Sequence, residues 1–407
     1  MKRVVITGMG TVSPLGYGIS ALMEGLDSGK SAVRFLEGWD RLKGLKCLVG
    51  APVALRDEKN IPRVFRRSMN KMSIMAVQAC DEALNMAGLG KDLLGNGRIG
   101  CVMGSTTGSP EAIASAFEKI LAGSIHELNS MAFFKTMSHT ISANVAQYLG
   151  LTGMVISACA ACASSLQSLC LGSDLIRFGK QDIMICGGAE ELHPVTIGSF
   201  DILEATSIRY QNTPEKTPRP FDQDRDGLVC GEGAGVLVLE EYEYAKKRGA
   251  EILAEIAGTF TNTSNVPVTQ SDAPSLGLCM KGALEDSGLS PEDIDYVNAH
   301  GTGTLHGDSA EAAAIHSVFG GKVPVSSLKG YMGHTLGASG AIESAASLMM
   351  LKKGVLYPGL NLDKPAEDCS IISLLLRKER KTVRNVLKNS FAFGGINASI
   401  IFRSLSQ

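Results

Sequence analysis

Three cysteines lie close together in the stretch VISACAACASSLQSLCLG, residues 155–172: Cys159, Cys162 and Cys170. The first two have the C-x-x-C spacing that occurs in zinc sites and in redox dithiols. A structural zinc site needs four ligands, and the sequence contains no second C-x-x-C. A thioredoxin-like dithiol belongs beside aromatic or charged residues, which SACAACAS does not provide. We therefore expect neither a metal site nor a redox pair here.

A third interpretation makes Cys162 a nucleophile. A strand is predicted at 154–157, and it leads through small residues into a helix that begins near residue 163. Cys162 would then lie at the helix N-terminus, where the dipole and the free N–H groups favour a thiolate and can stabilise an oxyanion. The residues alone leave a buried structural cysteine equally open. Cys159 is expected to end the strand, and Cys170 to pack in the core.

Two of the seven histidines lie in Gly/Thr-rich segments at the ends of predicted strands. They are His300 in NAHGTGT and His334 in KGYMGHTLGASGAIES. Sites in α/β proteins collect in such strand-end loops, so these two histidines are the candidate partners of Cys162. His306 and His316 lie in or beside the predicted helix DSAEAAAIHSVFG and are expected at the surface or in packing.

The composition of the chain excludes several classes of function. The chain has 407 residues and a formal net charge of −2, which gives no overall basic field for nucleic acid. No apolar run reaches the roughly 18 residues of a membrane span, and we expect no signal peptide. Most of the ten cysteines lie in apolar strings such as IMICGG, where a free thiol behaves as a small hydrophobe. A cytoplasmic, reducing location is therefore expected.

The elements that must position these residues alternate between strands and helices. Buried strands are predicted at RVVITGMG, RIGCVMG, DIMICGG, YVNAHGTG and VPVSSLKG, with a helix over 67–90 and another over 164–179. The alternation predicts α/β layers, and the pattern is compatible with two similar halves that meet near residue 250. The glycines of GMGTVSPLG (8–16) lack the spacing of a dinucleotide fingerprint and are expected to form a tight turn at a strand end.

Five ordered blocks resemble the β-ketoacyl-[acyl carrier protein] synthases, most closely the KAS II type of elongating condensing enzyme. The blocks are ACASSLQSL…ICGGAEE, RPFDQDRDGLVCGEGAGVLVLEEYEYAKKRGA, YVNAHGTGTLHGD, VSSLKGYMGHTLGASGAIES and NSFAFGGINASIIF. The resemblance implies a thiolase-like α/β fold, in which two similar βαβαβαββ halves form a five-layered α/β/α/β/α structure. The halves are expected at 1–250, with the nucleophilic cysteine, and at 251–407, with both histidines.

The resemblance also assigns roles to residues. Cys162, His300 and His334 match a Cys-His-His triad, while Lys329 matches the lysine near the second histidine and Glu343 the glutamate that supports it. The resemblance also assigns residues to the substrate. Thr302, Thr304 and, less directly, Thr269 match contacts of the pantetheine arm, and Phe393 matches a gate whose N–H joins the oxyanion hole. Phe133 and Phe134 match an element near the dimer interface and acyl pocket, and Thr106 and Thr107 lie at the base of the presumed acyl tunnel.

The implied reaction is a decarboxylative Claisen condensation for fatty acid elongation. An acyl chain held as a thioester on Cys162 condenses with malonyl-[acyl carrier protein], and carbon–carbon bond formation needs no metal and no cofactor of the enzyme's own. The phosphopantetheine belongs to the carrier protein. That acidic partner is expected to dock on a basic patch, for which Arg63, Arg66, Arg67 and Arg209 are candidates.

Some features depart from the family pattern. Segment 261–275 is shorter than in many relatives, and Ala392 stands where the gate usually has glycine. A polar wall at Thr106 and Thr107 would suit oxygenated or conjugated chains. These departures leave open a ketosynthase of a type II polyketide or polyene pathway. The chain is expected to form a homodimer, with a heterodimer containing a chain-length-factor subunit as the alternative.

Overall fold

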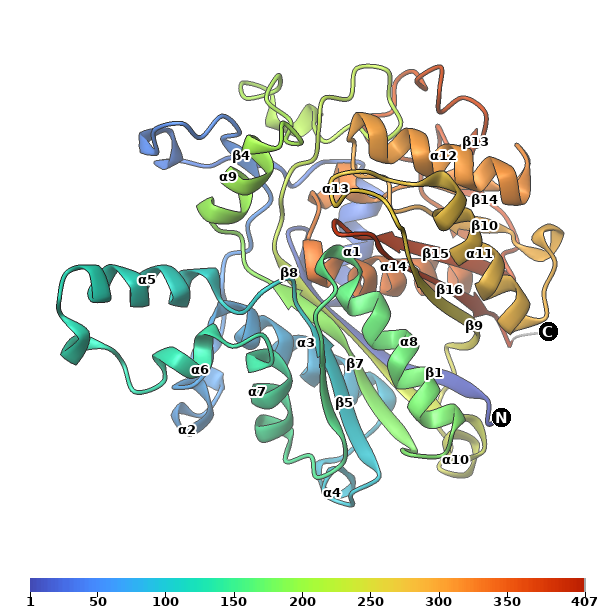
Figure 1. The fold of residues 1–407 in the computed structure, drawn as a ribbon. Helices are drawn as coiled ribbons and strands as arrows, with labels where there is room; N and C mark the ends of the chain where they lie inside the picture. Colours follow the sequence, from blue (N-terminus) through green and yellow to red (C-terminus); the bar gives the residue numbers. More distant parts are fainter. Residues whose placement is uncertain (406–407) are drawn as a thin grey trace.

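Two halves of the same topology build the molecule, of which the computed structural model describes residues 1–405 (Figure 1). The first half has strand order β1-β8-β7-β5-β6, and the second has β9-β16-β15-β10-β11. In each half the last strand in sequence lies antiparallel to its two neighbours, and the remaining pairs are parallel. The bounds are Val4–Ser13, Gly233–Glu241, Ile183–Glu190, Ile99–Gly104 and Val155–Ala158 for the first half, then Ala254–Thr263, Ile396–Arg403, Asn385–Phe391, Tyr296–Asn298 and Pro324–Ser326 for the second.

Strands β1 and β9 join the two halves edge to edge, through the pairs Val5–Glu255 and Ile6–Ala254. Short strands β2 (Gly16–Tyr17) and β13 (Ser373–Leu374) complete a sheet of twelve strands among the described residues. The chain passes from one half to the other between Lys247, the end of α10 (Tyr242–Lys247), and Ala254. The boundary predicted at residue 250 falls in this connection.

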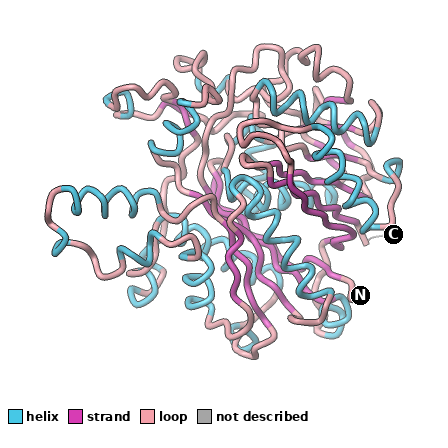
Figure 2. Tube along the Cα trace, in the orientation of Figure 1, coloured by secondary structure: helices cyan, strands magenta, loops and turns pink. Residues whose placement is uncertain are grey.

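Helices cover both faces of the sheet in each half (Figure 2). Helices α3 (Lys71–Ala87) and α7 (Thr140–Leu149) pack on the outer face of the first half. Helix α11 (Ala273–Ser287) does so in the second half, with α12 (Leu305–Phe319) packed beside it. Helices α8 (Ser164–Arg177) and α14 (Ser339–Lys353) contact each other between the two halves. This is the five-layered α/β/α/β/α arrangement expected from the sequence.

The strands read as continuous apolar runs because both of their faces are buried. In β8, Val236 and Val238 belong to the core under α3, while Leu237 and Leu239 belong to the core around α8 and α14. Successive side chains of a strand point to opposite faces, so one run of apolar residues serves two cores.

Small residues let the central helices approach each other. In α14, every residue from Ser339 to Leu348 is buried, in the order SGAIESAASL. A Cβ atom on Gly340 would lie 2.7 Å from the backbone nitrogen of Leu166 in α8. A larger side chain at this position would push the two helices apart.

The first glycines lie in a strand, and a tight turn follows it, as predicted. Gly8 and Gly10 are inside β1, which continues to Ser13, and the turn is at Pro14 and Leu15. A Cβ atom on either would come within 2.1 Å of a carbonyl oxygen of α3, at Ala83 and Ala79 respectively. These glycines allow the helix to lie close on the strand.

No helix in residues 1–405 combines the length and the apolar character that a membrane crossing requires.

Candidate active site

Cys162 lies in a tight turn between β6 and α8. The turn is the 3-10 helix Ala161–Ala163, and its first residue has a left-handed backbone with φ 45°. The side chain of Cys162 is 5% exposed. Burial raises the pKa of its thiol to about 11, although the N–H groups of Phe393 and of Cys162 itself and the Lys329 ammonium favour the thiolate. The sulfur therefore stays protonated at rest and lies beside groups that stabilise negative charge.

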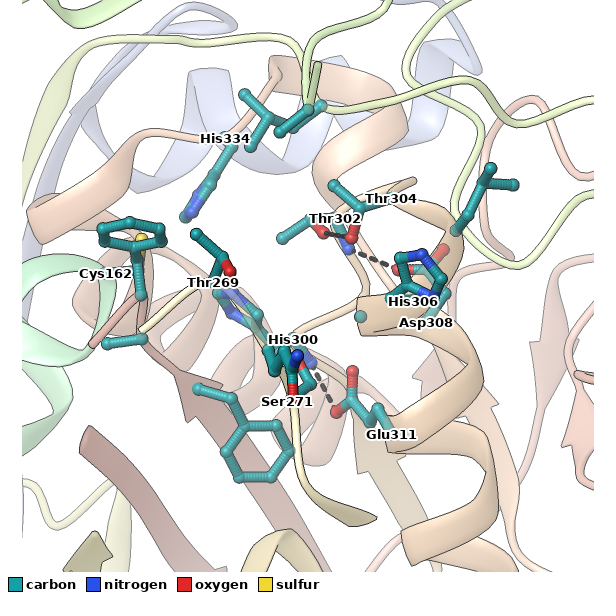
Figure 3. A pocket seen from close by; sticks show the side chains of 18 of the residues that line it. Cys162, Thr269, Ser271, His300, Thr302, Thr304, His306, Asp308, Glu311 and His334 are labelled. Carbon is teal, nitrogen blue, oxygen red and sulfur yellow. Dashed lines mark hydrogen bonds between the residues drawn. The ribbon is translucent and has the colours of Figure 1, made fainter. Parts of the chain in front are cut away.

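The structure brings both predicted histidines to this sulfur (Figure 3). His300 follows β10, where its backbone N–H and that of Gly301 donate to Glu311 of α12 at 2.8 and 2.7 Å. His334 follows α13 (Lys329–Met332), and its N–H donates to the carbonyl of Val229 at 2.7 Å. The two rings meet edge to face, with centroids 5.1 Å apart. One ligand atom from each of Cys162, His300 and His334 lies within 4.8 Å of the other two.

Both imidazoles are held neutral. Burial, together with the ammonium groups of Lys329 and Lys388, lowers the pKa values of His300 and His334 well below 6.5. The backbone N–H of Leu336 donates to Nδ1 of His334 at 3.3 Å, so this nitrogen is the acceptor and the proton is on Nε2. Nε2 of His334 is buried with no hydrogen-bond partner among the described residues. It is available to donate to a substrate oxygen.

A cluster of buried charges lies behind the histidines. Nζ of Lys329 donates to the carbonyl oxygen of His300 and, at 2.8 Å, to Oε1 of Glu343. Nζ of Lys388 in β15 lies 2.6 Å from the other oxygen of Glu343, Oε2. Lys329, Lys388 and Glu343 are each at most 1% exposed. Burial opposes ionisation of Glu343, but the two lysines outweigh it and hold the pKa of the carboxyl below its usual value.

This electrostatic setting disfavours a metal ion. The atoms of Cys162, His300 and His334 are close enough to bind one cation together. However, two ammonium groups share one carboxylate behind them, and Nε2 of His334 carries a proton rather than a free lone pair. The same arrangement suits a developing anion.

A cavity of about 430 Å³ opens onto the triad. Thr302 and Thr304 line it, and their hydroxyl oxygens are 2.9 Å apart. The N–H of Thr302 donates to Asp308 at 2.9 Å, which fixes the loop after β10 (Figure 3). Thr269 and His306 also line the cavity. The structure thus groups the three predicted pantetheine contacts with the triad.

Phe393 lies at the tip of the hairpin between β15 and β16. Its side chain is 43% exposed, and its ring meets Phe200 edge to face at 6.4 Å. Two backbone hydrogen bonds tie the hairpin to the segment that carries Thr269: Gly394 N–H to Val268 O at 3.1 Å, and Ser264 N–H to Gly395 O at 2.8 Å. The predicted gate and the altered 261–275 segment are therefore one connected loop pair.

Other predicted substrate residues lie outside this cavity. Thr107 is exposed, with its hydroxyl donating to the carbonyl of Gly108 at 2.8 Å. Phe133 is 75% exposed in α6 (Ala132–Thr136), and the Phe134 ring packs against His139 at 6.1 Å. None of the three lines the cavity at Cys162. Within one chain, the structure does not assemble the predicted acyl pocket.

The predicted docking arginines are at the surface but not in one patch. Arg63 and Arg66 are in α2 (Arg63–Arg66), and Arg67 follows it. Arg209 follows α9 (Pro194–Ile202), which Figure 1 shows well away from α2. Arg63, Arg67 and Arg209 are exposed, while Arg66 is half-buried and donates to the carbonyl of Glu58 at 3.1 Å.

Sequence reasoning missed three residues near the triad. Lys388 was missed, although a lysine in the middle of a buried strand, NVLKNSF, is an unusual feature that could have drawn attention to it. His306 was expected at the surface or in packing; it is exposed and also lines the cavity. Glu190 at the end of β7 is buried and accepts N–H bonds from Thr106 and Gly337 at 2.9 and 3.0 Å. Burial raises the pKa of Glu190 to about 7 despite these bonds.

Fold and site together define a condensing enzyme of the thiolase-like architecture. Residues 1–245 match the family model "Beta-ketoacyl synthase, N-terminal domain", and residues 253–363 match "Beta-ketoacyl synthase, C-terminal domain". The chain is 36% identical to 3-oxoacyl-[acyl-carrier-protein] synthase 1 of Haemophilus influenzae, covering 99% of both chains. The chain belongs to the β-ketoacyl synthase family and is a condensing acyltransferase.

Solved structures agree with this assignment. A β-ketoacyl synthase from Burkholderia phymatum STM815 is 42% identical, with a TM-score of 0.97 and full coverage of both chains. The ketosynthase complex AntDE:AntF, described as a type II PKS acyl-carrier protein with its ketosynthase bound to the hexaketide, is 30% identical over both full chains with a TM-score of 0.90.

The protonation states of the two histidines can be checked directly. We expect ¹⁵N NMR to show His334 with the proton on Nε2, and both His300 and His334 neutral at about pH 6.5, where an ordinary histidine is half protonated. Signals would be assigned by their loss in H300N and H334N. A neutral native imidazole that can protonate in the unfolded chain also lowers the free energy of unfolding as pH falls below about 6.5. Protonation of either ring near that pH would contradict the description.

Proposed function

We propose that Cys162, His300 and His334 carry out the 3-oxoacyl-[acyl carrier protein] synthase reaction of this enzyme. One observation supports this above all: a thiol at a helix start faces two neutral imidazoles inside one cavity. The acyl group and the malonyl group both arrive as thioesters of the carrier protein's phosphopantetheine. The reaction class uses no cofactor of its own.

In the first step, the sulfur of Cys162 attacks the acyl thioester carbonyl. The N–H groups of Cys162 and Phe393, which favour negative charge at this point, donate to the tetrahedral oxyanion. The carrier thiol leaves and takes the proton that Cys162 gives up. The product is an acyl thioester on Cys162.

In the second step, malonyl-carrier protein occupies the same cavity. Its C–C bond to the carboxylate breaks, CO2 leaves, and the electron pair moves to the thioester oxygen as an enolate. The Nε2–H of His334 donates to that oxygen, and the His300 ring lies beside the His334 ring, with the two centroids 5.1 Å apart. Neutral donors suit this task because they stabilise the charge without transferring a proton to it.

In the third step, the enolate carbon attacks the acyl carbonyl on Cys162. The second oxyanion uses the same two N–H groups, and its collapse expels the Cys162 thiolate. The carrier now holds a 3-oxoacyl chain two carbons longer. Thr302, Thr304 and Thr269 would position the pantetheine arm through their hydroxyl groups along the cavity.

Substitution of the two neighbouring cysteines tests the nucleophile. We expect C162A to abolish acyl transfer and condensation, because Cys162 is the thiol that lies within reach of both imidazoles in residues 1–405. C159A is the matched control and should keep most of the activity, since the Cys159 sulfur contacts the carbonyl of Thr106 instead. Mass spectrometry would locate the acyl group, and acylation of Cys159 would overturn the assignment.

A second experiment separates fatty acid elongation from polyketide or polyene synthesis. The wild type is given carrier-bound acyl chains of several lengths and oxidation states, and the products are identified.

We also propose that the chain acts as a homodimer. Strand β6 lies at the edge of the sheet with Met154 and Val155 exposed, and a bare edge can pair with a second copy. Exposed apolar side chains continue along α5 (Pro110–Leu121) and after it: Phe117, Ile120, Leu121, Ile125 and Phe133. A second copy would cover this face and could complete the acyl pocket at Thr107, Phe133 and Phe134.

Sedimentation velocity measures the oligomeric state. The wild type should sediment at twice the chain mass of 42.9 kDa. V155K places a charge on the bare edge and should shift the protein toward the monomer. F178K replaces an exposed apolar side chain just after α8, away from this face, and should leave the dimer unchanged. A monomeric wild type would contradict the proposal.

The carrier protein is proposed to dock at the arginines of α2, with Arg209 as a separate contact. Charge reversal in R66E/R67E should raise KM for carrier-linked substrate about tenfold and leave kcat unchanged. A small free thioester should react as before. R377E, which reverses an exposed charge elsewhere, serves as the control. Equal loss with both substrates would remove α2 from the docking surface.

A cytoplasmic location remains part of the proposal. All ten cysteines are free in the structure, which is compatible with a reducing compartment.

A further inference from the structure

Lys388 occupies a place where a lysine is unusual. It lies in the interior of β15, between Asn298 of β10 and Ile400 of β16, and its side chain is 0% exposed. Its Nζ donates to the carbonyl oxygen of the next residue, Asn389. A lysine is almost never fully buried unless its charge is compensated.

The compensation is incomplete. Nζ of Lys388 lies 2.6 Å from Oε2 of Glu343, as an ion pair rather than a directed hydrogen bond. Glu343 is already paired through Oε1 with Lys329 at 2.8 Å. One carboxylate therefore contacts two ammonium groups, so these three residues together carry one excess positive charge. The buried carboxylate of Glu311, which accepts from Asn389 at 3.3 Å, offsets this charge from farther away.

Burying the Lys388 ammonium opposes its charged form, which costs stability. An apolar side chain of similar volume in β15 would leave Lys329 and Glu343 as a neutral pair, and buried charge clusters can often be replaced in this way without loss of stability. A residue that lowers the folding stability and is nevertheless present at a site commonly serves the function of that site. Here the charge lies behind His300 and His334 and depresses the pKa of both.

We propose that Lys388 is a positioning residue for decarboxylation: with Lys329 it holds Glu343 in place and supplies a positive charge behind the two histidines that stabilises the enolate. This rests on the decarboxylating function proposed above. Lys388 does not line the cavity and so does not touch the substrate. Its effect passes through His300 and His334, whose donor N–H groups become better donors when a cation lies behind them.

The surroundings of Lys388 also predict a pH dependence. The charged and titratable groups that face it are Glu343 in α14, Lys329 in α13, Glu311 in α12, and His300 and His334 in the loops beside them. Burial, opposed by the two glutamates and reinforced by Lys329, lowers the pKa of the Lys388 ammonium to about 8. The positive charge is present below this value and lost above it, so decarboxylation should decline as pH rises through about 8.

The test uses full-length enzyme acylated on Cys162 beforehand, mixed with malonyl-carrier protein in a single turnover. For K388M we expect the rate of CO2 release at about pH 7 to fall about tenfold or more, with KM for the malonyl substrate unchanged. The first step, acyl transfer to Cys162, should stay within about twofold of wild type. The thermal midpoint should stay the same or rise, and the decline near pH 8 should disappear.

K388Q, neutral and polar, is the second variant and should behave like K388M. Unchanged CO2 release in either variant would overturn the proposal. So would equal loss of both steps with a lower thermal midpoint, because that pattern indicates a structural role. ¹⁵N NMR adds a readout independent of condensation: K388M should raise the pKa values of His300 and His334. If the wild type forms no 3-oxoacyl product, the proposed function fails, while this NMR shift still decides the electrostatic role of Lys388.

Discussion

The close packing of α8 against α14 is the constraint on which the site depends. Each helix belongs to a different half of the chain: α8 follows β6 in the first half, and α14 follows β11 and α13 in the second. Because glycine, alanine and serine line their contact, the helices can lie side by side between the two halves. Their N-terminal turns then meet at one point, which brings Cys162 of the first half within reach of His300 and His334 of the second. A wider spacing of the helices would separate the nucleophile from its partners.

Charge at this meeting point is controlled by burial. The thiol, the imidazoles and the lysine–glutamate cluster are all buried, so the protonation state of each group depends on its neighbours. The thiol and both imidazoles rest neutral, while the fixed positive charge lies one layer behind them. Negative charge is thus favoured only where the substrate develops it, first on an acyl oxygen and then on an enolate oxygen.

Much of this could be predicted from the sequence. Residues close in sequence to a distinctive turn, such as Cys162 before α8 or His300 after β10, were recognisable because glycine and small residues mark those turns. The two-half layering followed from strand–helix alternation together with the family resemblance. The close packing of α3 on Gly8 and Gly10 was not predictable, because glycine serves close helix packing as well as turns and the sequence does not distinguish the two uses.

The rest depends on contacts between distant segments. Lys388 and Glu343 are 45 positions apart, and only the fold shows that Glu343 pairs with two lysines. Thr107, Phe133 and Phe134 do not line the cavity at Cys162 within one chain, so their predicted place in the acyl pocket would need a second chain. His306 was expected as an ordinary helix residue, and it does lie in the first turn of α12, but it also lines the cavity.

The turn before α14 repeats the turn before α8. Each is a three-residue 3-10 helix whose first residue is left-handed, Ala161 at φ 45° and Leu336 at φ 47°. Gly337 therefore occupies the place that Cys162 has in the first half. Its N–H is taken by the carboxyl of Glu190, and a Cβ atom on Gly337 would lie 2.7 Å from that carboxyl. The duplicated fold thus builds this turn twice: the carboxyl of Glu190 occupies the turn at Gly337, while the turn at Cys162 opens onto the cavity, so the two halves do not form two equivalent sites.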